Sequence, residues 1–345
     1  MRRGLIARSA DELPDAALDA RLARVRAAMD AAALDALIVY TNNTRTAGVS
    51  WLTGFVPYWS EALLVLPRDG DPVLVVALTF RVKTWIERTS RVADVMHTPR
   101  IGLEAGRRIA AAKADAAVGI VDFDNLSTGI VDDLREGGPR LALRDASALF
   151  AKVRAVADSS EIALARKAGA IARDALLQIG ADGRHLGDML AAAEAAARER
   201  GAEEIYLAVA PDLARDPRLR RIEGDVVPGA SFAVRASVAY KGSWVRMTRT
   251  IGCDGAEAAA AAFAAAVRGL PSGRDFAGFG AWLVEGCRLA QPLEALMGSR
   301  VALAQPPVAG MIVSVQAQLD AGPTPVLIGA PVLVGQGLLA EPIVG

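Results

Sequence analysis

Two arginines lie on the two strands of a predicted β-hairpin in the second half of the chain. The segment SFAVRASVAY is followed by Lys241-Gly242 and then by SWVRMTRTI, which is typical of two strands joined by a tight turn. Because successive side chains of a strand point to opposite faces, Arg235 is predicted to lie diagonal to Arg246 on one face. Two neighbouring guanidiniums suit a carboxylate or a phosphate. That face is predicted to carry Arg235, Ser237, Trp244, Arg246 and Thr248.

Few other residues have types suited to nucleophilic catalysis or to soft-metal binding. The chain has two histidines, His97 and His185, and two cysteines, Cys253 and Cys287, with no CxxC or HxxxH spacing. A zinc site built from Cys and His is therefore nearly excluded. We expect both histidines to be peripheral and both cysteines to be reduced core thiols.

The composition is that of a core-rich globular protein. Of 345 residues, 52% are hydrophobic, and Lys+Arg and Asp+Glu are both 39, so the formal net charge is zero. A nucleic-acid binder needs a basic surface, so we expect no nucleic-acid partner. The uncharged stretch 321–340 is interrupted by prolines, which predicts buried strands rather than a membrane span. With no signal peptide in the sequence, we expect a cytoplasmic protein that has no membrane partner.

The predicted elements fall into two groups. Over residues 1–150, helices and strands alternate, which predicts an α/β domain that includes a hairpin turning at 68–71. Over residues 151–345, the order is two helices, the arginine-bearing hairpin, two more helices and a closing pair of strands. Asp158, Ser159 or Ser160 is suited to cap the first of these helices. The later helices are expected at 185–200, 257–270 and roughly 276–289, and the closing strands at 310–319 and 325–334.

Four segments resemble the creatinase and aminopeptidase P family. RLARVRAAMDAAALDALIVY followed by WLTGF resembles its N-terminal domain, and VRAVADSSEIALARKAG resembles the linker and first helix of its "pita-bread" catalytic domain. EGDVVPGASFAVRASVAYKGSWVRMTRTIG is similar to the family's central hairpin, and GMIVSVQAQL with PVLIGAPVLV to its closing strands. The resemblance implies an α/β creatinase-like N-terminal domain over 1–150, an α+β pita-bread domain over 151–345, and a homodimer.

The resemblance does not extend to the family's metal ligands. In the metallopeptidases of this family, carboxylates and one histidine hold two divalent metals. The aligned positions here hold other residue types, and guanidiniums at such a site repel a divalent cation. We therefore expect no metal, no other cofactor and no metallopeptidase activity. The five aligned positions are Arg235, Arg246, a position at or near Ser299, Gln316 and Gly329.

Creatinase works without metal, using a histidine on the stretch before the hairpin. The corresponding stretch here, VAPDLARDPRLRRIEGD, contains no histidine. Asp212 and Asp216 lie on it, and each is either a base or an ion-pair partner of the hairpin arginines. Tyr240 is a further candidate for proton transfer, although a solvated turn residue is the simpler interpretation. Gln316 either hydrogen-bonds a ligand or completes a core network.

Three further sets of residues have both a structural and a functional interpretation. Arg249 is expected on the opposite face of the hairpin, in a structural role. Asp320 is expected to be a turn residue. Trp51, Tyr58 and Trp59 either wall a pocket or pack in the core of the first domain.

Two functions are compatible with these residues. The first is a metal-free homologue of Xaa-Pro aminopeptidase and creatinase that binds a small carboxylate-bearing metabolite or peptide in the former active-site cleft. The second is a metal-independent enzyme, a C–N hydrolase, a lyase or an amide-forming enzyme, that uses the arginines to hold an anionic substrate. In the first, Arg235 and Arg246 bind the ligand. In the second, Asp212, Asp216 and Tyr240 are the catalytic candidates.

Overall fold

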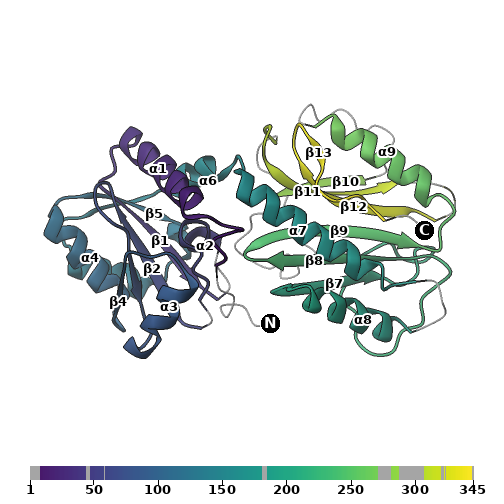
Figure 1. Cartoon of the computed structure of the whole chain (residues 1–345), viewed down its shortest axis with the longest axis horizontal. Coiled ribbons are helices and arrows are strands. Elements are labelled where there is room, and N and C mark those ends of the chain that lie inside the picture. The colour runs from purple at the N-terminus through teal and green to yellow at the C-terminus, as the bar shows by residue number, and fades with distance from the viewer. Residues whose placement is uncertain are drawn as a thin grey trace. The chain divides into compact units, whose positions relative to one another are not determined.

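The computed structural model describes residues 8–43, 47–57, 59–180, 185–270, 281–286, 307–319, 322 and 324–343. The chain divides into two compact units, Arg2–Ala155 and Val156–Gly345. Each unit is built on one sheet and is described by itself (Figure 1). Within the described residues, no helix is both long and apolar enough to cross a bilayer.

The first unit is a six-stranded sheet with helices on both faces. The strand order is β4-β3-β2-β1-β5-β6; β1–β2 and β2–β3 are antiparallel pairs, and the other neighbours are parallel. Its elements are α1 (Asp15–Ala31), β1 (Ala36–Asn42), α2 (Ala47–Thr53), β2 (Glu61–Pro67), β3 (Val73–Val76), η1 (Phe80–Val82), α3 (Lys83–Thr89), β4 (Asp94–His97), α4 (Ile101–Ala112), β5 (Ala117–Val121), η2 (Phe123–Asn125), α5 (Thr128–Gly137), β6 (Ala142–Asp145) and α6 (Ser147–Arg154).

The two faces of this sheet bury separate apolar cores. Leu37 and Val39 of β1 face the core that includes residues of α1, α2, α3 and α6. Ala36 and Ile38 face the core under α4 and α5. This alternation follows from the period of two in a strand, and it makes the first unit a three-layer α/β/α domain.

Helices α4 and α5 approach each other closely through glycines. A Cβ on Gly106 would lie 2.5 Å from the carbonyl oxygen of Leu134, and a Cβ on Gly102 would overlap the carbonyl of Ile130. The spacing of four residues puts both glycines on one side of α4, where they allow backbone-to-backbone packing. Any larger side chain there must push the two helices apart.

The second unit is a seven-stranded antiparallel sheet packed against helices α7, α8 and α9. The strand order is β10-β11-β12-β9-β8-β7, with β13 paired to β12. Figure 1 shows α7 lying across β8 and β9. The elements are α7 (Ser159–Leu176), α8 (Leu186–Glu199), β7 (Glu204–Ala210), β8 (Phe232–Tyr240), β9 (Ser243–Ile251), α9 (Ala256–Arg268), β10 (Ala281–Gly286), β11 (Ile312–Leu319), β12 (Val326–Leu333) and β13 (Gly337–Leu338).

Alternate side chains of the central strands pack against the helices. Val234, Ala236 and Val238 of β8 join the core formed with α7 and α8. Val313 and Val315 of β11 join Phe263 of α9 in a second core. Because side chains alternate along each strand, the intervening residues point to the opposite face, which carries the candidate site.

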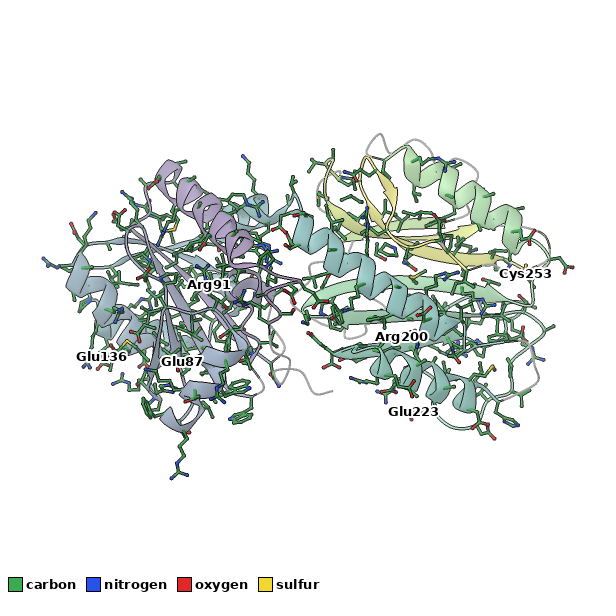
Figure 2. All side chains as sticks on the ribbon, in the orientation of Figure 1. Glu87, Arg91, Glu136, Arg200, Glu223 and Cys253 are labelled. Atoms are coloured by element: carbon green, nitrogen blue, oxygen red, sulfur yellow. The ribbon has the colours of Figure 1, made fainter. Side chains whose placement is uncertain are left out.

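The first helix of the second unit begins at a complete capping box. The Asp158 side chain accepts from the backbone N–H of Glu161, and the Glu161 side chain accepts from the N–H of Asp158. This reciprocal pair satisfies two N–H groups that a helix start leaves open. Near the other end of the helix, Asp174 pairs with Arg200 from the end of α8 at 2.6 Å, which ties α7 to α8 (Figure 2).

One sequence prediction needs correction. The segment 281–286, which falls within the helix predicted over roughly 276–289, is strand β10, paired antiparallel with β11. A short apolar run such as AWLVEG does not separate helix from strand by period alone, and the available edge of β11 decides the outcome. Trp51, Leu52 and Thr53 lie in helix α2, whereas Gly54 and Phe55 follow it in a loop. The predicted hairpin with its turn at 68–71 is confirmed by β2 and β3.

We predict that Gly106→Ala lowers the free energy of unfolding of the first unit by about 1–3 kcal/mol, because it overpacks the contact between α4 and α5. Gly129 of α5 is the matched control, since a Cβ there meets nothing within 4 Å. Gly129→Ala should be neutral or raise stability by up to about 1 kcal/mol. Urea unfolding followed by circular dichroism measures both. Equal effects of the two substitutions would contradict the close-packing interpretation.

Candidate functional site

The hairpin β8–β9 has the register that the sequence predicts. Lys241 and Gly242 have φ values of +45° and +77°, the left-handed pair that a tight hairpin turn requires. Arg235 is paired with Thr248 and Ser237 with Arg246, so Arg235 and Arg246 are diagonal neighbours on one face.

A lateral row of residues crosses the sheet at this level. Arg235 is opposite Thr248, Thr248 is opposite Gly329 of β12, and Gly329 is opposite Gln316 of β11. We call the surface formed by the side chains on this side of these strands the polar face. It carries Tyr206, Arg235, Ser237, Trp244, Arg246, Thr248, Ser314 and Gln316.

Hydrogen bonds connect most of these side chains. Arg246 Nε donates to Ser237 Oγ at 3.2 Å, and Ser314 Oγ donates to the Arg246 carbonyl at 3.1 Å. Thr248 Oγ1 donates to Gln316 Oε1, and Gln316 Nε2 donates to Ser314 Oγ at 2.9 Å. Ser237 and Ser314 have no exposed surface, and Arg246 is only 4% exposed. The network therefore satisfies buried polar groups, as burial requires.

The Gln316 carboxamide occupies the space above Gly329. A Cβ built on Gly329 would overlap Gln316 Oε1, Cδ and Nε2. The glycine and the glutamine therefore form a matched pair across β11 and β12. Of the two roles predicted for Gln316, the network role is the one for which the structure supplies contacts.

An aromatic pair borders the arginines on the β7 side. Tyr206 is paired with Ser237, and its ring stacks on that of Trp244 with centroids 5.9 Å apart and planes 18° from parallel. Trp244 is 5% exposed, whereas Tyr206 is only half-buried. The polar face thus combines hydrogen-bond donors with a flat apolar border.

Asp212 and Asp216 form ion pairs within their own loop. Asp212 pairs with Arg215 at 3.2 Å, and Asp216 pairs with Arg218 and Arg220, each at 2.8 Å. The hydrogen bonds from Arg218, above all, hold the pKa of Asp216 well below its usual range. Such a carboxylate is a weak base. Both aspartates therefore form ion pairs with loop arginines, a local pairing that the sequence did not predict.

Tyr240 lies on the wrong face to assist Arg235 or Arg246. Its side chain is 7% exposed and belongs to the core under α7 and α8. The Lys167 ammonium lies 4.4 Å from the centre of its ring. The expectation of a solvated turn residue is therefore wrong for Tyr240, because its position in the strand's alternation points it inward.

Arg249 anchors helix α7 from the helix-covered face. Its Nη1 donates to the carbonyls of Leu176 and Ile179, at 3.0 and 2.8 Å, beyond the last turn of the helix. Burial lowers the pKa of Arg249. A cation at a helix C-terminus is favourable, so this arginine has the structural contacts expected of it.

The remaining candidates belong to the first unit, to other segments of the second unit, or to stretches outside the described residues. His97 lies at the end of β4 with Nδ1 3.0 Å from the Leu78 carbonyl, and His185 Nδ1 lies 2.5 Å from Asp225. Cys253 is a free thiol in the connection between β9 and α9 (Figure 2). Trp51 is buried in the first unit, and Trp59 is 49% exposed. Tyr58, Cys287, Ser299 and Asp320 fall outside the described residues.

The family comparison agrees with this architecture. Residues 21–156 match the Creatinase/Prolidase N-terminal domain. The first unit is a creatinase/prolidase N-terminal domain. No curated protein matches the chain in sequence.

Solved structures of prolidases share the fold of nearly the whole chain. The prolidase from Pyrococcus horikoshii OT3 has 16% identity and a TM-score of 0.68, over 94% of this chain and 99% of that one. The Xaa-Pro dipeptidase from Bacillus anthracis has 18% identity and a TM-score of 0.68, over 95% and 99%. The N-terminal domain of FACT complex subunit SPT16 from Cicer arietinum has 13% identity and a TM-score of 0.57, over 94% and 96%. At these identities the likeness shows the fold, which is creatinase-like followed by pita-bread.

The residues on the polar face do not fit the pair of divalent metals that the metallopeptidases of this family hold. Arg235, Arg246, Gln316 and Gly329 supply no anionic oxygen, and hard cations need several. In the described part of the chain, no group of three or more His, Cys, Asp or Glu residues is arranged to hold a metal ion. We therefore derive no chemistry through a metal.

Sequence reasoning missed two members of the polar face, Ser314 and Tyr206. Ser314 precedes Gln316 by two residues on one strand, so the period of two was a sufficient signal. Tyr206 lies on β7, whose sequence EIYLAVA was not recognised as a strand. Its pairing with β8 is a long-range contact that local pattern does not reveal.

We predict that Gly329 and Gln316 are energetically coupled. Gly329→Ala should cost about 1–3 kcal/mol, since the methyl displaces a carboxamide that bonds Thr248 and Ser314. In the background of Gln316→Ala the same change should cost on the order of 1 kcal/mol less. A double-mutant cycle by urea unfolding measures this coupling. Gly187→Ala is the control, because a Cβ there meets nothing within 4 Å. Additive effects at 316 and 329 would contradict the matched-pair interpretation.

Proposed function

We propose that this chain is a metal-free homologue of the Xaa-Pro peptidases that binds a small carboxylate-bearing metabolite or peptide on the polar face. The observation that carries the proposal is the diagonal pair Arg235 and Arg246 at positions where the resemblance aligns carboxylate ligands. A site that attracts cations in the metallopeptidases attracts anions when the carboxylates are replaced by guanidiniums.

Two further features support a carboxylate as the ligand. Neutral groups that can donate hydrogen bonds lie beside the pair, with hydroxyls at Ser237 and Thr248 and an amide at Gln316. Arg246 is buried, and the hydrogen bond from its Nε to Ser237 orients the guanidinium. Because the side chain is already held in place, binding a ligand costs little further side-chain entropy. The half-buried ring of Tyr206 provides an apolar contact for the rest of the ligand.

The second candidate is a metal-independent enzyme that acts on an anionic substrate. Retention of both units over nearly the full length of the prolidases favours it. The catalytic groups considered for it are poorly disposed, since Tyr240 faces the helices and Asp216 is held in its ionised form by arginines. For this reason binding, rather than turnover, is the function we propose.

The proposal includes a cytoplasmic homodimer without nucleic-acid or membrane partners. The free thiol of Cys253 suits a reducing compartment, and a formal net charge of zero gives no overall attraction to phosphate backbones. Light scattering tests the dimer, and a strictly monomeric species would remove that part of the proposal.

We predict that a carboxylate ligand stabilises the wild type and not the arginine variants. Thermal unfolding is followed with dipeptides, amino acids, guanidino acids and phosphorylated metabolites, and at 100-fold its Kd a ligand adds about 2.7 kcal/mol. Arg235→Gln should weaken binding at least tenfold, as about 1.4 kcal/mol is lost with one charge-assisted hydrogen bond. Isothermal titration calorimetry gives the affinities.

The controls separate binding from folding. Arg215→Gln removes an 87% exposed arginine of the same unit and should bind like the wild type. Arg246→Gln is the second arginine variant. If it does not fold, Arg246→Lys takes its place, because lysine keeps the charge but lacks the planar guanidinium. If no carboxylate binds and the arginine variants are markedly less stable, the two arginines are structural and this proposal fails.

We also predict that divalent metals neither co-purify with the protein nor stabilise it. Elemental analysis should find Mn, Co and Zn far below stoichiometric, and neither EDTA nor added Mn²⁺ should shift the unfolding temperature. A metallopeptidase of the same fold serves as the positive control. One or two equivalents of metal per chain would contradict both candidate functions.

A further inference from the structure

Three arginines of the first unit converge on one buried tryptophan. The guanidinium carbons of Arg21, Arg24 and Arg154 each lie 5.4 Å from the centre of the Trp51 ring. Arg21 and Arg24 come from α1, Arg154 comes from α6, and Trp51 comes from α2. Helix α1 packs against both α2 and α6 (Figure 1). Phe150 closes another side, edge-on to Trp51 with centroids 5.7 Å apart. We call Trp51 and these three arginines the Trp51 cluster.

The Trp51 cluster concentrates positive charge in a small volume. Since each guanidinium carbon is 5.4 Å from one point, no two of them are more than twice that distance apart. This is about the Debye length of ~10 Å at 0.1 M salt, and burial weakens the screening further. Arg21 is itself only 2% exposed. Cation–π attraction explains one or two such neighbours, but each added cation raises the repulsion among them.

The indole N–H of Trp51 is a second, independent observation. Trp51 is 5% exposed, and its Nε1 is buried with no hydrogen-bond partner among the described residues. An indole nitrogen only donates, and a buried donor without an acceptor costs about 1–3 kcal/mol. The site therefore calls for an acceptor, and the surrounding guanidiniums favour one that is negatively charged.

We infer that the Trp51 cluster is a binding site for an oxyanion, a phosphate or carboxylate group, that accepts from Trp51 Nε1 and from the arginines. Arg21 Nη1 donates to the Trp51 carbonyl at 2.8 Å, and each guanidinium has five N–H groups in a plane, so it can bond more than one acceptor. The site lies wholly within the first unit and uses no residue of the polar face. It is therefore separate from the proposed function and stands or falls without it.

The test uses inorganic phosphate and, in a separate arm, acetate, each at constant ionic strength balanced with chloride. The full-length protein is followed by thermal unfolding and by the ¹⁵N–¹H signals of its five tryptophan indoles. The Trp51 signal is the one that disappears in Trp51→Phe, which keeps an aromatic ring at this position. Arg24→Gln removes a half-buried member of the Trp51 cluster, and Arg88→Gln removes an exposed arginine of the same unit as a control.

We expect phosphate or acetate to move the Trp51 indole signal saturably in the wild type and in Arg88→Gln. Binding should be at least tenfold weaker in Arg24→Gln and in Trp51→Phe, the latter read from the shift in unfolding temperature. Preference for one anion identifies the group bound. A wild-type indole signal that neither anion moves overturns the inference, as does equal stabilisation of the wild type and Trp51→Phe. If Arg24→Gln does not fold, Trp51→Phe decides the outcome.

Discussion

The arrangement of the second unit depends on the register of one hairpin. The left-handed pair Lys241 and Gly242 fixes which residues of β8 face which residues of β9. A slip of one residue would turn Arg235 and Arg246 into the core beneath α7 and would expose Val234 and Val245. Because burying unpaired charge is far more costly than any alternative turn, the register is strongly determined. The polar face exists as a consequence of this register.

The same alternation explains why the hairpin's arginines have unrelated roles. Arg249 is three residues from Arg246 and therefore points to the other face, where it bonds the end of α7. Arg246 points to the polar face and bonds Ser237. Residue type alone does not separate an anchoring arginine from a ligand-binding one, whereas strand parity and the position of the helices do.

The sequence was sufficient where local chemistry decides the structure. The Asp158 capping box, the 241–242 turn and the parity of Arg235 and Arg246 all follow from residues close together in the chain. It was insufficient where a distant partner decides: β10 is a strand because β11 offers it an edge. It also missed one local contact, the pairing of Asp216 with Arg218 and Arg220, because this loop has no helix or strand period to predict it. The contacts of Gln316 depend on strands brought together from positions almost seventy residues apart, so its two roles could not be separated beforehand.

Neutral hydrogen bonds, and not anionic oxygens, connect the strands at the positions that the resemblance aligns with metal ligands. A dinuclear centre holds several strands together by attraction between anionic oxygens and cations. Here neutral hydrogen bonds among Thr248, Gln316 and Ser314 connect β9 to β11 across β12, and Gly329 makes room for the glutamine that spans them. Only the arginines add net charge to this arrangement, and its sign is opposite to that of the carboxylates they replace. Because the described hydrogen bonds connect these strands without an anionic ligand set, the charge of the two arginines is compatible with the anion binding that we propose.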